Sequence, residues 1–168
     1  LEYRSLKRPY ELIPGLAADL PTQRPGDPGY TVYRFDLRPG MVYENDPAFG
    51  LGMPGRMTRE IVASDVAFEL CRLADPGVNS PVVEPFSNIQ GFQEFGQALS
   101  QRREEDPAFA NLPIHEQYAA LGGIDGVKTV GDHGLEVSVS SDYPQIQYWF
   151  AMPFTSPVPW EAVAFYDG

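Results

Sequence analysis

The sequence predicts an α+β domain in which a small mixed or antiparallel sheet is interleaved with helices. A strand pattern covers residues 31–37 and a hairpin pattern covers 127–139, while the strongest helix pattern, Ala63–Ala74, lies between them. Strands and helices do not alternate regularly along the chain, which argues against parallel βαβ units. A chain of this length buries roughly 70% of its unfolded surface, so we expect residues 1–168 to form a single domain.

Composition limits the possible partners. The 23 Asp and Glu residues outnumber the 12 Lys and Arg residues, and the formal net charge of −11 disfavours nucleic acid and anionic membranes. No apolar run of about 18 residues is present, so we expect no transmembrane segment. The single Cys71 forms no internal disulfide. The start at Leu1, without Met or signal peptide, and the end at Gly168 suggest a mature or excised piece.

The first third of the chain is predicted to be mostly irregular around one clear strand. Residues 1–30 are rich in proline, with one or two helical turns expected in 14–20 and a loop in 23–29. The strand at 31–37 follows, and a short return strand is expected at 41–43. Alternation places three apolar side chains of the first strand on one face, namely Tyr33, Phe35 and Leu37.

An exposed loop is predicted for residues 44–58, which are rich in glycine and proline. Gly50, Gly52 and Gly55 match the spacing of a dinucleotide-binding fingerprint. That fingerprint requires a strand before it and a helix that begins within it, and Pro54 breaks this context. We therefore expect a flexible loop and no nucleotide cofactor.

Helices dominate the centre of the chain. Ala63–Ala74 carries an apolar stripe and has Ser64 and Asp65 near its start, where we expect Ser64 to cap the free N–H groups. Weaker helices are predicted at 88–99 and 114–121, and residues 102–106 are predicted to be a solvated charge run. The strands of the hairpin are expected at 127–130 and 135–139.

The chain ends in an aromatic segment. Apolar runs at 146–152 and 162–166 flank a connector that contains Pro153, Pro157 and Pro159. Pro153 ends a first short helix, and Pro159 suits the start of a second one at 160–166. Three aromatic side chains are candidates for lining a pocket, although core packing is the favoured interpretation: Trp149, Phe154 and Trp160.

Catalytic and metal-binding groups are sparse. Neither His115 nor His133 has an identifiable partner, and Cys71 lies on the apolar stripe of a helix, where cysteine is usually inert. Glu44 and Asp46 are a poor acid pair because a mobile loop does not hold two carboxylates in register. No cluster of Cys and His indicates a metal site. The residues alone therefore indicate no catalytic site, no metal and no cofactor.

Four ordered stretches resemble a known family: 33–41 (YRFDLRPGM), 63–76 (ASDVAFELCRLADP) with the following Asn-Ser-Pro, 126–139 (GVKTVGDHGLEVSV) and 143–163 (YPQIQYWFAMPFTSPVPWEAV). Together they are similar to the N-terminal portion of family 5 extracellular solute-binding proteins, the oligopeptide- and dipeptide-binding type that serves ABC importers. Val62 and Glu69 depart from the Thr and Ser of the family pattern. The resemblance nevertheless covers nearly all of the chain.

The resemblance implies a subdomain of a two-lobed, periplasmic-binding-protein-like fold, present here as a fragment of the first lobe. It implies binding of peptides or similar polar solutes outside the cytoplasmic membrane, with an importer permease as partner and possible lipoprotein anchoring. Most ligand contacts in the family come from parts outside this fragment. The loop after Ser80-Pro81 is the place expected to reach the cleft, which nominates Val82, Val83 and Phe86 as ligand-binding residues. The competing interpretation is that these side chains cover the core.

Two other functions stay open from the sequence. A stand-alone interaction domain would present aromatic side chains such as Trp160, and a small hydrolase would use His115 or His133. The full reading frame distinguishes them, because a signal peptide before Leu1 and a continuation after Gly168 favour the binding protein.

Overall fold

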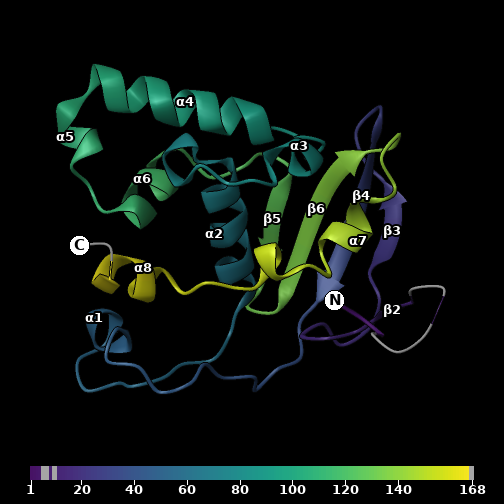
Figure 1. Ribbon diagram of the computed structural model, residues 1–168, viewed down its shortest axis with the longest axis horizontal. Helices are drawn as coiled ribbons and strands as arrows, with labels where there is room; N and C mark the ends of the chain where they lie inside the picture. The colour runs from purple at the N-terminus through teal and green to yellow at the C-terminus, as the bar shows by residue number, and fades with distance from the viewer. Residues whose placement is uncertain (5–7, 9–10, 167–168) are drawn as a thin grey trace.

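The computed structural model describes residues 1–4, 8 and 11–166 and confirms the α+β class (Figure 1). In this part of the chain the strands form two antiparallel sheets. The smaller sheet pairs β1 (Glu2–Tyr3) with β2 (Leu12–Ile13). The larger sheet has the order β3 (Thr22–Pro25), β4 (Tyr30–Asp36), β6 (Gly134–Ser140), β5 (Val127–Val130).

The pair β4–β6 is the centre of the larger sheet. Its register places Tyr33 opposite Val137 and Phe35 opposite Leu135. Because side chains alternate between the two faces, Tyr33 and Phe35 of β4 share one face with Leu135, Val137 and Val139 of β6, and all five are buried. The opposite face carries charged side chains, where Arg24 pairs with Glu136 at 2.9 Å.

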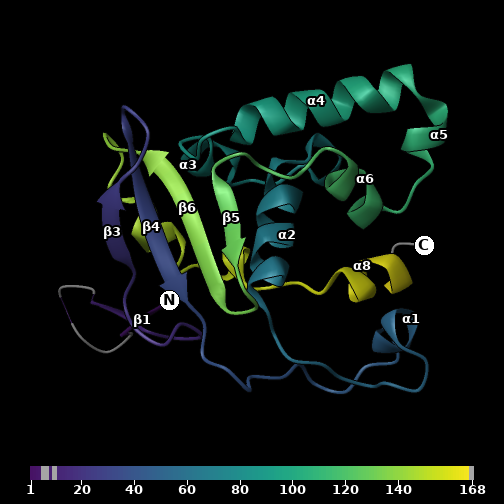
Figure 2. The same cartoon turned by 180° about the vertical axis from the view of Figure 1, so that it is seen from behind.

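Eight α-helical segments occur in the described residues: α1 (Phe49–Gly52), α2 (Ala63–Ala74), α3 (Val83–Phe86), α4 (Phe92–Glu105), α5 (Pro107–Ala110), α6 (Ile114–Ala120), α7 (Ile146–Trp149) and α8 (Trp160–Tyr166). Two 3₁₀ turns accompany them: η1 (Pro76–Val78) and η2 (Pro153–Thr155). Both views show α2 beside the sheet, α4 lying across one end of α2, and α1 next to α8 (Figures 1 and 2). No described helix is long and apolar enough to cross a membrane.

Helix α2 lies at the centre of the core and contacts most of the other elements. It contacts β5, β6, α3, α4 and α6, and Leu70 at its centre is fully buried. Its approach to α4 is close, because a Cβ added at Gly96 would lie 2.5 Å from the Ala74 carbonyl oxygen. Glycine at position 96 therefore permits the two helices to pack against each other.

Several predictions for the first 60 residues were wrong. Residues 14–20 form no helix, because this segment runs alongside β4, with Ala17 bridged to Leu37 and the Ala18 N–H donating to Asp36. The first part of the predicted loop at 23–29 belongs to β3. The remainder of the predicted irregular segment includes 5–7 and 9–10, which lie outside the described residues.

Within residues 41–60 the predicted strand is shorter than expected, whereas the predicted loop is more ordered than expected. The return strand at 41–43 is reduced to one bridge, between Val42 and Glu60. The predicted exposed loop contains α1 and buries Ala48 and Phe49, because the Phe49 ring packs against the Tyr43 ring at 5.4 Å.

The start of α2 is capped by Asp65 rather than Ser64. The Val62 N–H donates to the Asp65 carboxylate at 3.0 Å, whereas Ser64 is exposed. A carboxylate in the first helical turn also interacts favourably with the helix dipole. The prediction of capping by Ser64 was therefore wrong.

The boundaries of α4 also differ from the prediction. Residues 88–91 lie before the helix, because Ile89 bridges to Val139 on the sheet. The helix then continues through the charge run predicted to be solvated. Arg103 in that run forms a bidentate ion pair with Asp75: its Nη1 and Nη2 atoms donate to Oδ1 and Oδ2 at 2.6 and 2.8 Å.

Asp75 anchors the end of α2 in a buried polar cluster. Its side chain is 1% exposed, and it also accepts hydrogen bonds from the Tyr118 hydroxyl and the Gly77 N–H. Burial alone raises the pKa of Asp75, but the hydrogen bonds from Arg103, Tyr118 and Gly77 outweigh it, so the net pKa is lowered. The ionised Asp75 carboxylate therefore stabilises the folded state fully above the ordinary carboxyl pKa. This stabilisation is lost as the pH falls through the lowered pKa of Asp75.

We expect the substitution Asp75→Ala to lower the free energy of unfolding by about 3 kcal/mol, because it leaves the Arg103 guanidinium without its partner in a largely buried site. Urea denaturation followed by circular dichroism measures this change. Glu104→Ala, an exposed change on the same helix, is the control and is expected to shift stability by no more than about 0.5 kcal/mol. A loss below about 1 kcal/mol for Asp75→Ala would contradict the assigned role.

Candidate binding site

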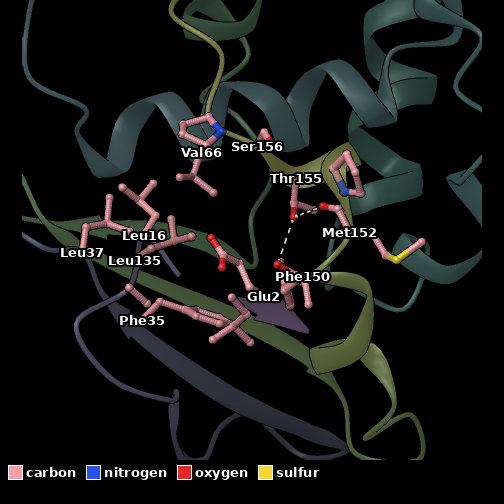
Figure 3. Close-up of a pocket in the computed structure, with 15 residues that line it drawn as sticks. Glu2, Leu16, Phe35, Leu37, Val66, Leu135, Phe150, Met152, Thr155 and Ser156 are labelled. Carbon is pink, nitrogen blue, oxygen red and sulfur yellow. Dashed lines mark hydrogen bonds between the residues drawn. The ribbon is translucent and has the colours of Figure 1, made fainter. Parts of the chain in front are cut away.

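An apolar hollow of about 290 Å³ lies between the inner face of the larger sheet, α2 and residues 150–157 (Figure 3). Phe35 and Leu37 reach it from β4 and the end of that strand, and Leu135 reaches it from β6. Strand alternation sets these three on one face, which explains why the hollow opens on the buried side of the sheet.

The opposite wall comes from the aromatic segment at the end of the chain. Phe150 and Met152 line the hollow, and Phe150 packs against Phe35 with ring centroids 4.9 Å apart. The Thr155 hydroxyl lies 3.2 Å from the carbonyl oxygens of both Phe150 and Met152, to which it donates. These bonds fold the proline-containing connector back on itself and hold the wall in place.

One charged side chain faces this hollow. Figure 3 shows the Glu2 carboxylate directed into it among aliphatic and aromatic side chains. Mostly apolar walls with a few polar groups are typical of small-molecule sites. Most of the lining side chains are aliphatic or aromatic, so the hollow is suited to holding an apolar group.

Neither histidine lines this hollow, and each contacts a different side chain elsewhere. His133 Nε2 is 2.9 Å from Glu60 Oε1. A hydrogen bond from the Gly40 N–H and the contact with His133 lower the pKa of Glu60. The His115 ring stacks on the Trp160 ring, with centroids 4.1 Å apart. Within the described part of the chain, neither histidine bonds to a serine, threonine or cysteine, which leaves a histidine-activated nucleophile without structural support.

The remaining candidate groups have structural contacts. Asp46 accepts hydrogen bonds from the Ala48 N–H at 2.8 Å and from the Tyr166 hydroxyl at 2.9 Å, so it stabilises the turn before α1. Cys71 is 6% exposed, and burial raises the pKa of its thiol to about 12, only partly opposed by a hydrogen bond from the Ile124 backbone. The predicted burial of Cys71 is confirmed.

The three aromatic residues considered as candidates for a pocket or for the core lie in three different environments. Trp149 packs against the core, and its Nε1 donates to the Tyr143 hydroxyl at 3.0 Å. Phe154 is 36% exposed. Trp160 lines a second hollow, between α6 and α8, together with His115.

A buried ion cluster around Arg59 was missed by the sequence analysis. Its guanidinium forms paired hydrogen bonds with Asp65, at 2.8 and 2.7 Å, and with Glu161, at 2.7 and 2.8 Å. It also lies over the Tyr43 ring, 5.3 Å from its centroid. Burial, and secondarily the negative charge of Asp65, raises the pKa of Tyr43. The sequence carried no signal for this cluster, because its members are separated by as many as 102 positions.

The three residues nominated for ligand binding lie in and next to α3. Val82 is 6% exposed and Phe86 is 0% exposed, and the Phe86 ring packs edge-on against Phe150. Val83 is 42% exposed and lines a shallow groove beside α4. Only Val83 among the three therefore presents its side chain to solvent.

Metal and nucleotide sites find no support in the described residues. No three His, Cys, Asp or Glu side chains there are grouped so that they could hold a metal ion. Gly50 and Gly52 lie within the single turn α1 and Gly55 follows it, and no strand leads into them. The dinucleotide fingerprint therefore lacks its required context.

Comparisons with solved structures identify proteins with the same fold. The pheromone receptor PrgZ, from a study of its mode of peptide binding, matches 98% of this chain at 22% identity, with a TM-score of 0.63. The substrate-binding domain of an oligopeptide ABC transporter from Bacillus anthracis matches 99% of it at 22% identity (TM-score 0.58), and Listeria monocytogenes OppA bound to peptide matches 92% at 21% identity (TM-score 0.56).

The similarity is confined to part of these proteins. The chain spans 25%, 25% and 23% of PrgZ, the Bacillus protein and OppA, respectively. The sequence matches no protein-family model and no curated protein. The fold is thus that of a portion of oligopeptide-binding proteins, as the resemblance in sequence led us to expect.

We expect Cys71 to resist thiol reagents in the folded protein. At about pH 8, a thiol with its raised pKa reacts roughly a thousandfold more slowly than the cysteine of an unstructured peptide, even before burial is considered. Reaction with Ellman's reagent, with and without denaturing urea, measures this. Release of one equivalent of chromophore within seconds from the folded chain would refute the placement of Cys71 in the core.

Proposed function

We propose that this chain is part of the first lobe of a solute-binding protein that delivers peptides or similar polar solutes to an ABC importer. The observation that carries this proposal is the likeness of nearly the whole chain to about a quarter of several peptide-binding proteins. In this proposal residues 1–168 form one domain of a longer polypeptide. It acts outside the cytoplasmic membrane, as a soluble or lipid-anchored protein, and passes its ligand to the importer permease.

Two-lobed binding proteins work by closure. A ligand that touches both lobes stabilises the closed state by its greater affinity for that state. A part of one lobe supplies at most one wall of such a site. The proposal therefore assigns to this chain a rigid surface on which a ligand rests, and assigns the opposing contacts to the remainder of the polypeptide.

The segment around α3 is proposed to contribute to that wall. Val83 has the exposure needed for direct ligand contact, whereas Val82 and Phe86 are anchored in the core and fix the position of the segment. The fully buried Phe86 packs against Phe150, so the aromatic segment at the end of the chain supports α3 from the core side.

A binding role is favoured over a catalytic one. The structural neighbours are binding proteins. His133 is engaged by Glu60 and His115 by Trp160, and no nucleophile is bonded to either in the described residues. A hydrolase would need such a partnership.

We expect the 168-residue chain alone to bind no tri- to pentapeptide with a Kd of about 10 μM or lower, because it lacks the opposing lobe. Isothermal titration calorimetry with a mixture of short peptides measures this. The longer polypeptide, expressed with its preceding and following sequence, is the matched comparison, and mass spectrometry of its bound ligands should reveal peptides or similar polar solutes.

Two results would contradict the proposal. Micromolar peptide binding by the isolated chain would show that it contains a complete site. A longer polypeptide that carries no solute and binds no peptide would remove the proposed function itself.

A further inference from the structure

Exposed apolar side chains gather at the end of the molecule where α1 lies next to α8 (Figures 1 and 2). Of the 14 large apolar side chains that are exposed in the described part of the chain, five lie within two short stretches, 51–57 and 165–166. We refer to these five, which are 44% to 62% exposed, as the α1–α8 patch: Leu51, Met53, Met57, Phe165 and Tyr166. Exposed apolar side chains that occur singly need no explanation, whereas a cluster of them marks an interaction site.

Contacts through Asp46 join the two halves of the patch. The Tyr166 hydroxyl donates to the Asp46 carboxylate at 2.9 Å, and the Asp46 N–H donates to the Met57 carbonyl oxygen at 2.6 Å. The Met53 N–H donates to the Phe49 carbonyl oxygen and so belongs to the end of α1, which itself contacts α8. The end of α8 and the segment that follows α1 therefore form one preformed surface, which avoids the ordering cost that weakens association through mobile segments.

This surface is nearly free of charge. Residues 47–57 and 160–166 contain only two charged residues, Arg56 and Glu161, although 21% of the chain is charged. Glu161 is buried against Arg59, so α8 presents no charged side chain to solvent. A helix that is apolar on all sides is typical of a protein interior. Depletion of charge together with aromatic side chains and methionine is the composition of an interface core, so the patch fits a surface that is covered in the functional protein.

We propose that the α1–α8 patch is the surface against which the following part of the longer polypeptide packs. The inference rests on one part of the proposed function, namely that the chain continues after residue 168. Tyr166 belongs to the patch, so a segment that continues the polypeptide begins at this surface and has an effective concentration there of about 1 mM or more. The solved proteins of similar fold contain about four times as much chain, which is ample to cover the patch. We expect the covering face to be apolar, because a charged side chain would be desolvated there without a partner.

Oxidation of methionine by hydrogen peroxide, mapped by mass spectrometry, tests this coverage, because burial shields a thioether from the oxidant. Met41 is the internal reference, since it is exposed in the same segment but lies at its other end, where the Ile61 N–H donates to its carbonyl oxygen. In the 168-residue chain, Met53 and Met57 should be oxidised at rates within about threefold of that of Met41. In the longer polypeptide, Met53 and Met57 should react at least about tenfold more slowly, while Met41 keeps its rate.

A matched pair of substitutions tests the same surface without oxidation. Met53→Lys places a charge in the patch, and Met41→Lys places the same charge outside it. Both should leave the unfolding temperature of the 168-residue chain within about 1 °C of its original value, since both side chains are exposed there. In the longer polypeptide Met53→Lys should lower the unfolding temperature by at least about 3 °C, because the ammonium group is buried without a partner, and Met41→Lys should not.

Three outcomes would overturn the inference. Equal oxidation of Met53 and Met57 in the two proteins, or equal effects of Met53→Lys on both, would show that the patch stays uncovered. Protection of the two methionines in the 168-residue chain through self-association, detected by sedimentation velocity, would assign the patch to a second copy. A longer polypeptide that protects Met53 and Met57 but binds no peptide would, by contrast, remove the proposed peptide-binding function and support this inference.

Discussion

Helix α2 is fixed at both of its ends by a buried carboxylate that is paired with an arginine from another part of the chain. At its start, Asp65 binds Arg59, which also holds Glu161 of α8. At its end, Asp75 binds Arg103 of α4. The carboxylates of Asp65 and Asp75 are 3% and 1% exposed, so each pair must be kept closed to avoid an unpaired buried charge. These two pairs determine where α4 and α8 lie relative to the sheet.

Helix α2 contributes a wall to each of the two hollows. Val66 lines the one beside the sheet and Phe68 lines the one beside α8. Residues two apart on a helix point about 200° away from each other, so α2 separates the two sites and forms a wall of each. A rigid α2 thereby provides the common support for surfaces that the sheet, the aromatic tail and α6 complete.

The sequence predicted the elements that local patterns determine. The helix Ala63–Ala74, the strand predicted at 31–37 and the hairpin with His133 in its turn each have a clear period or turn signal, and all are present, with the strand observed at Tyr30–Asp36. It failed where long-range pairing decides: residues 14–20 follow β4 instead of coiling, and Arg103 enters a buried pair instead of solvent. Trp160 shows the same limit for the candidate sites, since its pocket depends on a stacking partner 45 positions away (160 − 115).

The central claim, that Arg59 fixes α8 to the core, is tested most directly by hydrogen exchange of backbone amides in Arg59→Met, with Arg56→Met, exposed in the same loop, as control. A helix as short as α8 is not stable without tertiary contacts. The account predicts that amides of α8 exchange at least roughly tenfold faster in Arg59→Met while those of β4 and β6 keep their protection, and that Arg56→Met changes neither. Unchanged protection of α8 in Arg59→Met would contradict it.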